Sequence, residues 1–317
     1  MSIRQDSVAR VEQLCKNYDE TQVLKGVSLT IAPGEFFVLM GPNGSGKSTL
    51  LSIMAGTNSF GSGIVEIAGK DICEDRLAAR ECIGYVPQES FCSHFLTGRE
   101  NLWYFAGLLG LPKSERAERI DELLEMMGLE EDADRRVAEY SGGMRKKLEI
   151  ATALLSDVRI LLLDEPSTGL DPAVRKDFLS LLSKINARGT AILMVTHIGE
   201  DAEMASRVGL MVSGEIIAEG TPSELTERSG LSTSIVIDAS PRSEELVKVL
   251  SDFSLERRVE RFNGGFRISS EDSSLTVPRI TDALHQSGFE IIRVESKPPS
   301  LEDIFYQVAG RPIRGEA

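Results

Sequence analysis

Several features that define whole classes of protein are scarce or absent in this sequence. No apolar run approaches the roughly 18 to 20 residues that cross a bilayer, and Met1 to Lys16 lack the continuous apolar core of a signal peptide. The cysteines, Cys15, Cys73, Cys82 and Cys92, form no Cys-x-x-Cys pair and no disulfide-rich framework. We therefore expect a cytoplasmic protein without membrane spans, whose cysteines are reduced thiols with structural roles.

Basic residues are outnumbered by acidic ones. The 317 residues include 49 Asp and Glu against 35 Lys and Arg, which gives a formal net charge of −14. Such a charge opposes general binding to nucleic-acid phosphates, so we expect no nucleic acid among the partners. The length, with 41% hydrophobic residues, suits one large domain and a smaller one.

The strongest motif fits the pattern Gly, four free positions, then Gly-Lys-Ser/Thr, which binds nucleotide phosphates. It follows a strand-like apolar run, Phe36 to Met40, and precedes apolar residues at helical spacing from Leu50 to Met54. A helix N-terminus leaves backbone N–H groups unpaired, and these can bind phosphate oxygens. The motif consists of Gly41, Pro42, Asn43, Gly44, Ser45, Gly46, Lys47, Ser48 and Thr49.

Two side chains of this motif carry specific chemistry. Lys47 adds a positive charge for the β- and γ-phosphates. The Ser48 hydroxyl is placed to ligate Mg²⁺, which keeps most of its ligands as water and phosphate oxygen. The alternative is a Gly-rich turn with a solvated lysine, which the strand, loop and helix setting disfavours.

Two adjacent carboxylates end the apolar strand that begins at Ile160. Asp164 suits Mg²⁺ ligation, and Glu165 is the candidate to orient or deprotonate an attacking water. Neighbouring strand residues point in opposite directions, so one carboxylate can face the metal and the other the reaction. The alternative is a pair of solvated acids at a strand end. The presence of the nucleotide motif disfavours this alternative.

The run of apolar residues from Ala191 predicts a second buried strand that ends at His197. Its polar C-terminal end lies at the edge where open α/β sheets bind ligands. His197 can donate a hydrogen bond to a γ-phosphate there, although a lone histidine is more often structural. Tyr18 lies in the polar connection of an expected β-hairpin between Ser7 and Ile31. It can stack on a nucleotide base or make an ordinary surface contact.

Helices are expected from Gln88 to Ser156. Thr97 and Glu100 have capping-box spacing, so a helix should start there and carry apolar residues that include the only tryptophan, Trp103. The spacing favours a helix buried in its own subdomain. The alternative is a hydrophobic groove for a partner's helix, and the two can apply to different faces.

Glycines precede a second helix. Ser141 to Gly143 lead into an expected helix from about Met144 to Leu155, with Arg145 to Lys147 in its first turn. Cations there oppose the helix dipole, and a nearby anion would remove the conflict. The alternative is an ordinary loop with a serine N-cap.

A further helix start is predicted near Asp171. Asp171 is suited to be an N-cap, and Pro172 is suited to be the first residue of the helix.

In this order the motifs resemble those of the ATP-binding subunit of an ABC transporter, and the resemblance covers Val8 to Leu225. It implies a Mg²⁺-dependent ATPase that binds ATP at Gly41 to Thr49, with Tyr18 stacking on adenine. It assigns catalysis to Glu165, His197, Lys47 and Gln88, and Mg²⁺ binding to Ser48, Gln88 and Asp164. It assigns the signature, which acts on the ATP of another subunit, to Ser141, Gly142, Gly143 and Met144, and the dimer contact to the Ser167 to Asp171 loop.

The resemblance also implies partners. They are a second ATP-binding subunit, in a homodimer or heterodimer joined head to tail, and integral-membrane permease subunits that hydrolysis drives through alternating access. The chain would then lie peripherally at the cytoplasmic face of the cell membrane. The stretch Leu96 to Leu111 becomes a candidate wall of the permease docking groove.

One departure from the family pattern is informative. The usual Leu-Ser-Gly-Gly-Gln reads Tyr140-Ser141-Gly142-Gly143-Met144, which is similar to the branch serving ABC-2-type exporters, including drug-resistance subunits. The closing stretch Pro299 to Phe305 resembles the tail of that branch. An importer ATPase is therefore disfavoured. The alternative function is that of a soluble ABC-type ATPase acting on a macromolecular machine. Such proteins usually carry two cassettes or long coiled coils, and this chain has one cassette and no heptad run, so this alternative is disfavoured as well.

After Gly230 the order strand, helix, strand, strand, helix, strand fits a ferredoxin-like domain, with helices at Ser243 to Leu250 and Ile280 to Gln286 and a hairpin turn at Asn263 to Gly265. We thus predict an α/β P-loop NTPase ABC cassette over residues 1–228. It should contain an antiparallel β-subdomain and a helical subdomain at about 89–156. A small α+β (ferredoxin-like βαββαβ) domain should follow over 229–317.

Overall fold

The computed structural model describes residues 7–262, 265–271, 273–297 and 299–309. Contacts divide the chain into two compact units, of which the second begins at Ser223. The first has a large core that joins residues of two sheets and a helix, and the second has a smaller core of its own. No helix within the described ranges is long and apolar enough to cross a membrane.

A six-stranded sheet in the order β10-β9-β3-β8-β7-β6 forms the centre of the first unit. Strands β9 to β6 of that order pair in parallel, and β10 pairs antiparallel at one edge. β3, β7 and β8 are buried along their whole length, as in a parallel sheet covered on both faces. The strands are β3 (Phe36–Met40), β6 (Ile83–Val86), β7 (Ile160–Asp164), β8 (Ala191–Thr196), β9 (Arg207–Val212) and β10 (Glu215–Gly220).

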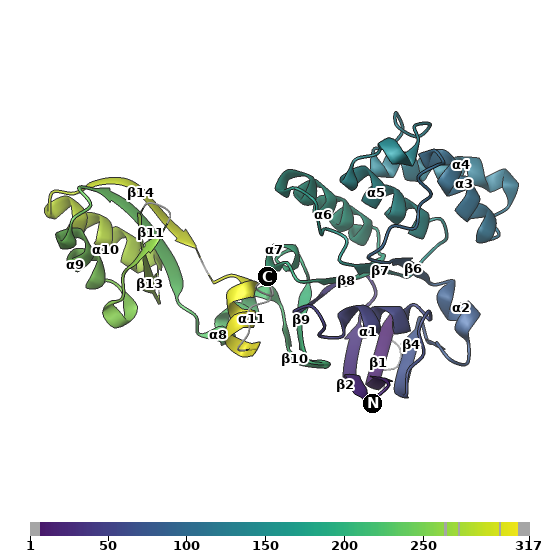
Figure 1. Ribbon diagram of the computed structural model, residues 1–317, viewed down its shortest axis with the longest axis horizontal. Helices are drawn as coiled ribbons and strands as arrows, with labels where there is room; N and C mark the ends of the chain where they lie inside the picture. Colours follow the sequence, from purple (N-terminus) through teal and green to yellow (C-terminus); the bar gives the residue numbers. More distant parts are fainter. Residues whose placement is uncertain (1–6, 263–264, 272, 298, 310–317) are drawn as a thin grey trace. The chain divides into compact units, whose positions relative to one another are not determined.

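An antiparallel sheet in the order β2-β1-β4-β5 packs against the first sheet with α1 between them (Figure 1). β1 and β2 form the expected hairpin, and Tyr18 ends β1 beside the turn. Leu24, Leu50 and Val195, which come from the two sheets and α1, are fully buried in one core. The elements are β1 (Ala9–Tyr18), β2 (Thr21–Ile31), β4 (Ser62–Ile67), β5 (Lys70–Asp71), α1 (Lys47–Met54) and α2 (Arg76–Arg80).

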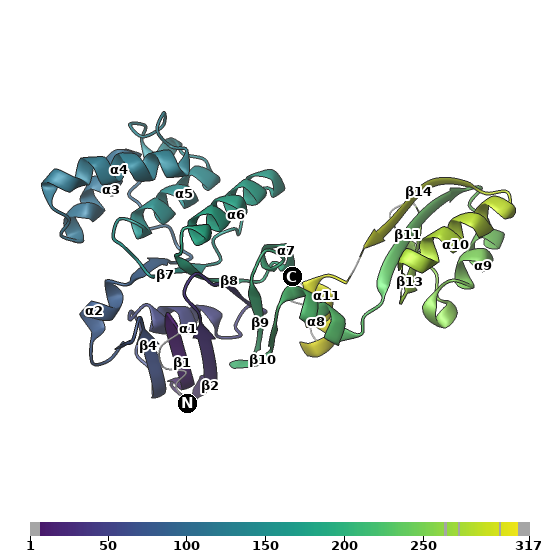
Figure 2. The same ribbon diagram turned by 180° about the vertical axis from the view of Figure 1, so that it is seen from behind.

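Helices α3, α4 and α5 pack on one another on the other side of the parallel sheet (Figures 1 and 2). α3 starts with the expected capping box, because the Thr97 hydroxyl accepts from the Glu100 N–H and the Glu100 carboxylate accepts from the Thr97 N–H. The helices are α3 (Gly98–Leu108), α4 (Lys113–Met127), α5 (Gly142–Ala153), α6 (Pro172–Ala187) and α7 (Gly199–Ala202), with a short 3-10 turn at Val137–Glu139.

The face of α3 that carries the tryptophan lies at the surface. Leu102 and Ala106 are fully buried against the other helices, but Trp103, Tyr104 and Leu108 are 43%, 55% and 65% exposed. The prediction that this helix would be buried in its own subdomain is therefore wrong for Trp103. A helix can bury only the stripe that faces its neighbours, so one that is apolar all round leaves the rest uncovered.

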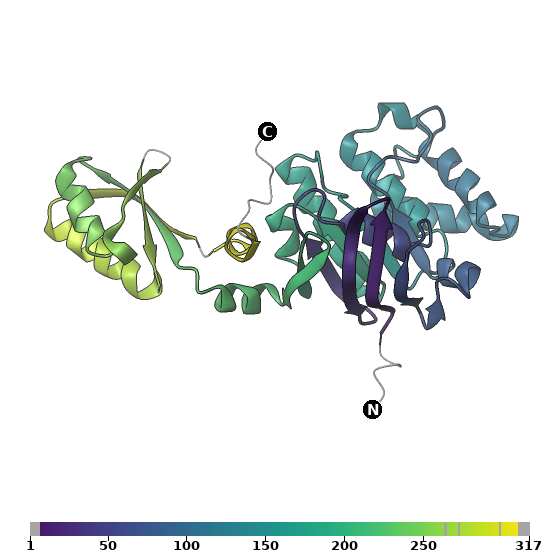
Figure 3. The same cartoon turned by 60° about the horizontal axis from the view of Figure 1, so that its bottom comes forward.

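The second unit contains an antiparallel sheet in the order β12-β13-β11-β14, with α9 and α10 on one face (Figure 3). This is the strand order of a ferredoxin-like fold, as predicted. α10 begins at Ser273 rather than Ile280, and the helix includes Pro278. Asn263 and Gly264 of the expected hairpin turn lie outside the described residues. The elements are α8 (Pro222–Ser229), β11 (Thr233–Ser240), α9 (Glu244–Ser251), β12 (Glu260–Phe262), β13 (Gly265–Ser270), α10 (Ser273–Gln286), β14 (Glu290–Lys297) and α11 (Leu301–Ala309), with a 3-10 turn at Leu255–Arg257.

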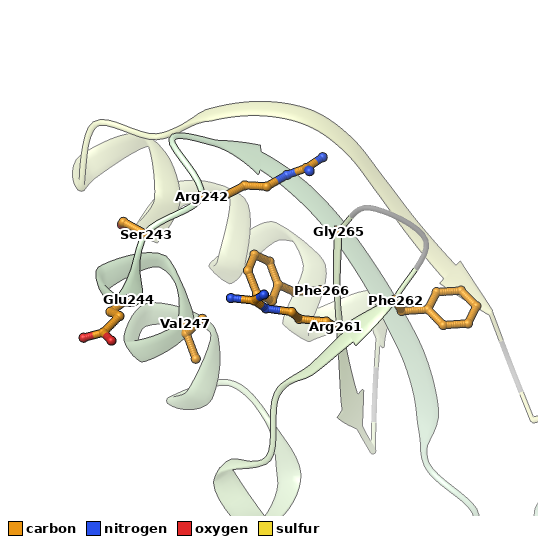
Figure 4. A pocket seen from close by; sticks show the side chains of 8 residues that line it. All are labelled: Arg242, Ser243, Glu244, Val247, Arg261, Phe262, Gly265 and Phe266. Atoms are coloured by element: carbon orange, nitrogen blue, oxygen red, sulfur yellow. The ribbon is translucent and has the colours of Figure 1, made fainter.

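A hollow of about 460 Å³ lies between α9 and the strands β12 and β13 (Figure 4). Arg261 extends over Phe266 beside Val247, whereas Phe262 points away from them (Figure 4). None of the residues predicted to bind nucleotide lines this hollow.

All four cysteines are free thiols, as expected. Cys92 is buried, and burial raises the pKa of its thiol to about 12. Cys73 is exposed, so the expected structural role does not apply to it.

Candidate nucleotide site

A cavity of about 440 Å³ opens beside the N-terminus of α1, where β3 ends. It brings together residues that are more than 140 positions apart in the sequence, from Tyr18 to Glu165. The lining residues are Tyr18, Val23, Asn43, Gly44, Gly46, Lys47, Ser48, Thr49, Gln88 and Glu165. Most of the predicted nucleotide residues thus share one cavity.

The glycines of the motif let the loop wrap closely around this cavity. Gly44 and Gly46 adopt φ of +78° and +104°, a region that favours glycine. A Cβ on Gly46 would lie 2.9 Å from a Leu24 methyl group and 3.0 Å from the Val23 carbonyl oxygen. Gly46 is the N-cap of α1 and offers no side-chain cap, so the first N–H groups of the helix remain available to a ligand.

Lys47 is a buried cation in this cavity. Its side chain is 4% exposed, and its ammonium donates to the carbonyls of Gly41 at 2.8 Å and Pro42 at 3.0 Å. Burial lowers the pKa of Lys47, against the opposing charges of Asp164 and Glu165. The hydroxyl of Ser45, also buried, has no hydrogen-bond partner among the described residues. A buried cation beside a hydroxyl that lacks such a partner fits a polyphosphate.

Ser48 and Asp164 meet at the same place. The Ser48 hydroxyl donates to Asp164 Oδ1 at 2.9 Å, and burial raises the pKa of this carboxyl, which is only 4% exposed. Over the described part of the chain, no group of three or more His, Cys, Asp or Glu side chains could hold a metal ion. A hydroxyl and one carboxylate beside a phosphate cavity nevertheless fit Mg²⁺, which takes its other ligands from phosphate and water.

Glu165 and His197 face each other across the ends of β7 and β8. The Glu165 Oε1 atom lies 3.2 Å from His197 Nδ1, although this nitrogen is not aligned for a hydrogen bond. Thr168 donates to the other carboxylate oxygen at 3.3 Å. Glu165 has φ of +47°, a strained conformation for a residue with a side chain. The fold therefore holds this carboxylate at the cavity wall at some energetic cost.

Tyr18 is held from two sides. Its hydroxyl accepts a hydrogen bond from Asn58 Nδ2 at 2.5 Å, and the Lys16 ammonium lies 4.7 Å from the ring centroid. The side chain lines the cavity and is still 46% exposed. A fixed ring with a free face beside a phosphate site is suited to stack on a base.

The signature residues do not line this cavity. Ser141 is the N-cap of α5, which begins at Gly142 rather than Met144, and its hydroxyl accepts from the Met144 N–H at 3.2 Å. A Cβ on Gly143 would lie 2.5 Å from Val174 Cγ1, in the first turn of α6. Asp171 is the N-cap of α6, so the signature and the dimer loop are neighbours.

One of the three cations after the signature has an acidic partner that the sequence reading overlooked. Lys146 donates to Glu149 Oε2 at 3.0 Å, and Glu149 is fully buried in α5. The Lys146 ammonium also reaches the backbone carbonyl of Gln88 at 3.4 Å. Lys146 thus has an anionic partner within its own helix.

Four further residues contact the predicted site and were also missed from the sequence, namely Lys16, Asn58, Thr168 and Asp201. No local motif marks them. Lys16 and Thr168 contact residues two and three positions away, whereas Asn58 and Asp201 bind Tyr18 and Ser167, which only the fold brings near.

Comparisons with known proteins cover both units. The family model described as "ABC transporter" matches residues 24–168, and the model described as "ATP-binding protein DrrA1-3-like, C-terminal domain" matches residues 220–309.

The full chain is similar to curated proteins. It is 30% identical over 308 residues to the linearmycin resistance ATP-binding protein LnrL of Bacillus subtilis (strain 168), covering 96% of this chain and 99% of that protein. It is 35% identical over 306 residues to the Nod factor export ATP-binding protein I of Rhizobium meliloti (strain 1021), covering 96% and 88%.

Two solved structures match the first unit. One is cbiO1 from Clostridium perfringens, part of the ABC transporter complex cbiONQ, with a TM-score of 0.65, 31% identity, and coverage of 70% of this chain and 92% of that chain. The other is a dimeric post-hydrolysis state of the ATP-binding cassette MJ0796 bound to ADP and Pi. Its TM-score is 0.61 at 31% identity, covering 67% and 98% of the two chains.

Proposed function

The chain belongs to the family of ABC transporter ATP-binding proteins and is an ABC ATPase, and on this premise we propose that it powers export through a separate ABC-2-type membrane permease. The observation that carries the export proposal is similarity along nearly the whole chain to relatives named for export and for resistance. The match of residues 220–309 to a drug-resistance type of C-terminal domain supports the same branch.

The residues at the cavity have different proposed roles in ATP hydrolysis. Lys47 and the free N–H groups of α1 bind the phosphates and stabilise the charge that develops on them. Glu165 accepts a proton from the attacking water, and His197 contacts the γ-phosphate. Mg²⁺, bound through Ser48 and Asp164 with Gln88 close by, would neutralise negative charge on the phosphates.

The signature and the dimer loop favour an active unit of two subunits. Ser141 to Gly143 lie outside the cavity that holds the rest of the predicted site in one chain. In the proposed dimer they contact the γ-phosphate bound to the other subunit, beside the Ser167 to Asp171 loop. The dimeric relative of known structure supports this arrangement.

An exposed apolar surface on the first unit supports docking to the permease. A hollow of about 670 Å³ lies among Leu77, Tyr85, Phe91, Phe105, Leu108 and Leu109. Of the side chains that line it, Leu77, Leu108 and Leu109 are 78%, 65% and 54% exposed, and Phe95, three residues before α3, is 89% exposed. We call this set, with Trp103 and Tyr104, the docking face. Its occupant in our proposal is a cytoplasmic helix of the permease, which would hold the chain peripherally at that side of the membrane.

Domain limits form part of the same proposal. Residues 1–228 make up the ATP-binding cassette, with a helical subdomain at about 89–156, and residues 229–317 form the accessory domain. The two compact units and the two family matches support a division close to this boundary.

Hydrolysis and its base are tested with Glu165→Gln. This variant keeps the shape of the side chain and loses its basicity, so we expect it to bind Mg-ATP and remain as a stable dimer in sedimentation experiments, with hydrolysis reduced at least a hundredfold. Hydrolysis at the wild-type rate would show that Glu165 is not the base.

The export proposal is tested by purifying the full chain from its own cells in detergent. A polytopic membrane protein should co-purify, and Leu108→Glu on the docking face should abolish its recovery. Ile292→Glu is the matched control, because Ile292 is a similarly exposed aliphatic residue, at 63%, in the other unit. Recovery with ribosomes or DNA instead of a membrane protein would favour an ATPase that acts on a macromolecular machine.

A further inference from the structure

A buried acidic residue lies just beyond the predicted γ-phosphate contact. Asp201 belongs to α7, four residues after His197, and is fully buried. Its Oδ2 atom accepts two hydrogen bonds, from the Ser167 hydroxyl and, at 2.9 Å, from the Thr196 hydroxyl. Ser167 and Thr196 are fully buried as well. A single carboxylate oxygen thus joins two loops that belong to different strands.

Each of these loops carries a predicted part of the site. Ser167 lies two residues after Glu165 and begins the dimer loop that ends at Asp171. Thr196 ends β8 directly before His197, and its hydroxyl accepts from the Ile198 N–H at 3.0 Å. The backbone on both sides of His197 is therefore tied to the oxygen that holds the dimer loop.

A second contact joins the same regions at the surface. Arg175, in the first turns of α6, donates to the Leu170 carbonyl at 3.4 Å and lies 3.3 Å from Glu200 of α7. The dimer loop and the segment after His197 are thus linked twice, once through a buried carboxylate and once through a partly exposed ion pair.

The buried link is energetically unfavourable for the isolated chain. The other oxygen of Asp201, Oδ1, is buried without a hydrogen-bond partner among the described residues, and burial raises the pKa of the carboxyl. Leaving a charged acceptor half satisfied costs free energy that a smaller neutral side chain would avoid. Costly buried polar groups of this kind are common where strain or rigidity serves a functional site.

We propose that Asp201 is a positioning residue that couples the Ser167 to Asp171 loop to His197. A contact between the dimer loop and a second subunit then sets where the imidazole stands relative to the γ-phosphate. The coupling rests on the proposed function, because it requires a dimer in which this loop meets another copy. It makes hydrolysis depend on subunit contact through a path inside one chain.

A purely structural role predicts something different. If Asp201 only satisfies two buried hydroxyl groups, its loss should lower the melting temperature and leave the turnover of the folded dimer unchanged. If it positions His197, its loss should lower kcat while ATP affinity and dimer formation stay the same. The separation of kcat from binding therefore discriminates between the two roles.

Two substitutions break the link from opposite ends. Ser167→Ala removes the bond to the dimer loop and leaves the Thr196 bond in place. Asp201→Ala removes the carboxylate that accepts from both hydroxyls. Asp177→Ala is the matched control, because it makes the same chemical change at an exposed position of α6.

The measurements use the full-length chain. ATP affinity and ATP-dependent dimerisation are measured in the Glu165→Gln background, and kcat is measured with Glu165 present, at protein concentrations that saturate the dimer. We expect kcat to fall about tenfold in each single variant, with ATP affinity and dimerisation within twofold of the parent. The double variant should lose no more than Asp201→Ala alone, because that change already removes the Ser167 bond. Asp177→Ala should match the parent.

Two results would overturn the proposal. A kcat within twofold of the parent in Ser167→Ala and Asp201→Ala would leave the bond with a structural role alone, and so would losses that add in the double variant. Failure of the proposed function is recognised separately in the parent protein. If its activity per subunit does not change with concentration and ATP does not induce a dimer, the dimer and the coupling are both wrong.

Discussion

The nucleotide cavity places three charged side chains, Lys47, Asp164 and Glu165, in unfavourable surroundings. Burial lowers the pKa of Lys47 and raises that of Asp164, so each group is held where its charged form is disfavoured. Glu165 adds an unfavourable backbone conformation at the same place. Such conflicts are expected where a ligand of opposite charge completes the site.

A prediction about stability and pH follows from Asp164. Its folded-state pKa is raised, so the folded protein holds this proton more tightly than the unfolded chain, and stability is lost as the pH rises from about 3.8 through the folded pKa. Asp164→Asn should therefore stabilise the ligand-free protein at pH 7 by about 1 kcal/mol, a usual size for one substitution. The advantage should shrink as the pH is lowered, which urea unfolding at several pH values measures. A variant less stable than the parent at pH 7 would contradict this account.

A second residue-scale prediction concerns Tyr18. Stacking on a base contributes about 1 to 3 kcal/mol, so Tyr18→Ala should weaken ATP binding about tenfold. Binding of inorganic tripolyphosphate, which has no base, should not change. Tyr104→Ala, at a similarly exposed tyrosine on the docking face, serves as the control. Equal losses for ATP and tripolyphosphate would mean that Tyr18 supports the loop rather than the base.

Sequence reasoning found the site residues whose role is tied to a short motif. Asn43, Gly44 and Gly46 to Thr49 of the predicted loop line one cavity with Tyr18 and Glu165, as their predicted roles require. Asn58 and Asp201 carry no such mark, because Asn58 donates to Tyr18 and Asp201 accepts from Ser167, and both partners are remote in sequence. Such partners depend on tertiary geometry, which periodicity and spacing do not contain.

At the scale of elements, local sequence signals predicted where a helix starts, but they did not predict which of its side chains are buried. The start of α3 was predictable because its capping box involves only Thr97 and Glu100. The exposure of Trp103 was not, because it depends on which stripe of α3 meets α4 and α5. The start of α10 was placed too late, at Ile280, although the helix begins at Ser273 and accommodates Pro278.

The α3 cap gives an element-scale prediction. Thr97→Ala removes the hydroxyl that accepts from Glu100 and should lower the free energy of unfolding by about 1 kcal/mol. Ser114→Ala, at an exposed position of α4, is the control and should have little effect. Urea denaturation followed by circular dichroism measures both. Equal effects of the two changes would mean that the cap contributes nothing to stability.

Across the whole molecule, the fold of each unit was predictable from the sequence, on different grounds. The cassette fold of the first unit followed from the resemblance of its motifs to those of ABC transporter ATP-binding subunits, and the second sheet followed from the order of six elements. The sequence could not reveal what the second unit does, because no motif with recognisable chemistry lies in it.

The separate core of the second unit makes a whole-molecule prediction. Residues 223–309 include a buried cluster contributed by β11, β13, α9 and α10, so we expect this fragment to fold alone and to unfold cooperatively on heating. Residues 1–222 should still bind ATP, because every residue of the cavity lies within them. A fragment 223–309 without a cooperative transition would show that its core needs the rest of the chain.

The docking face has a consequence for the cell that makes this protein. A newly synthesised chain that has not met its partner carries Leu77, Phe95 and Leu108 in water, each more than 60% exposed. Orphan copies are therefore targets for chaperones and proteases and are prone to aggregate. We expect the dosage of the two genes to be matched, so that the supply of permease limits how much of this ATPase accumulates.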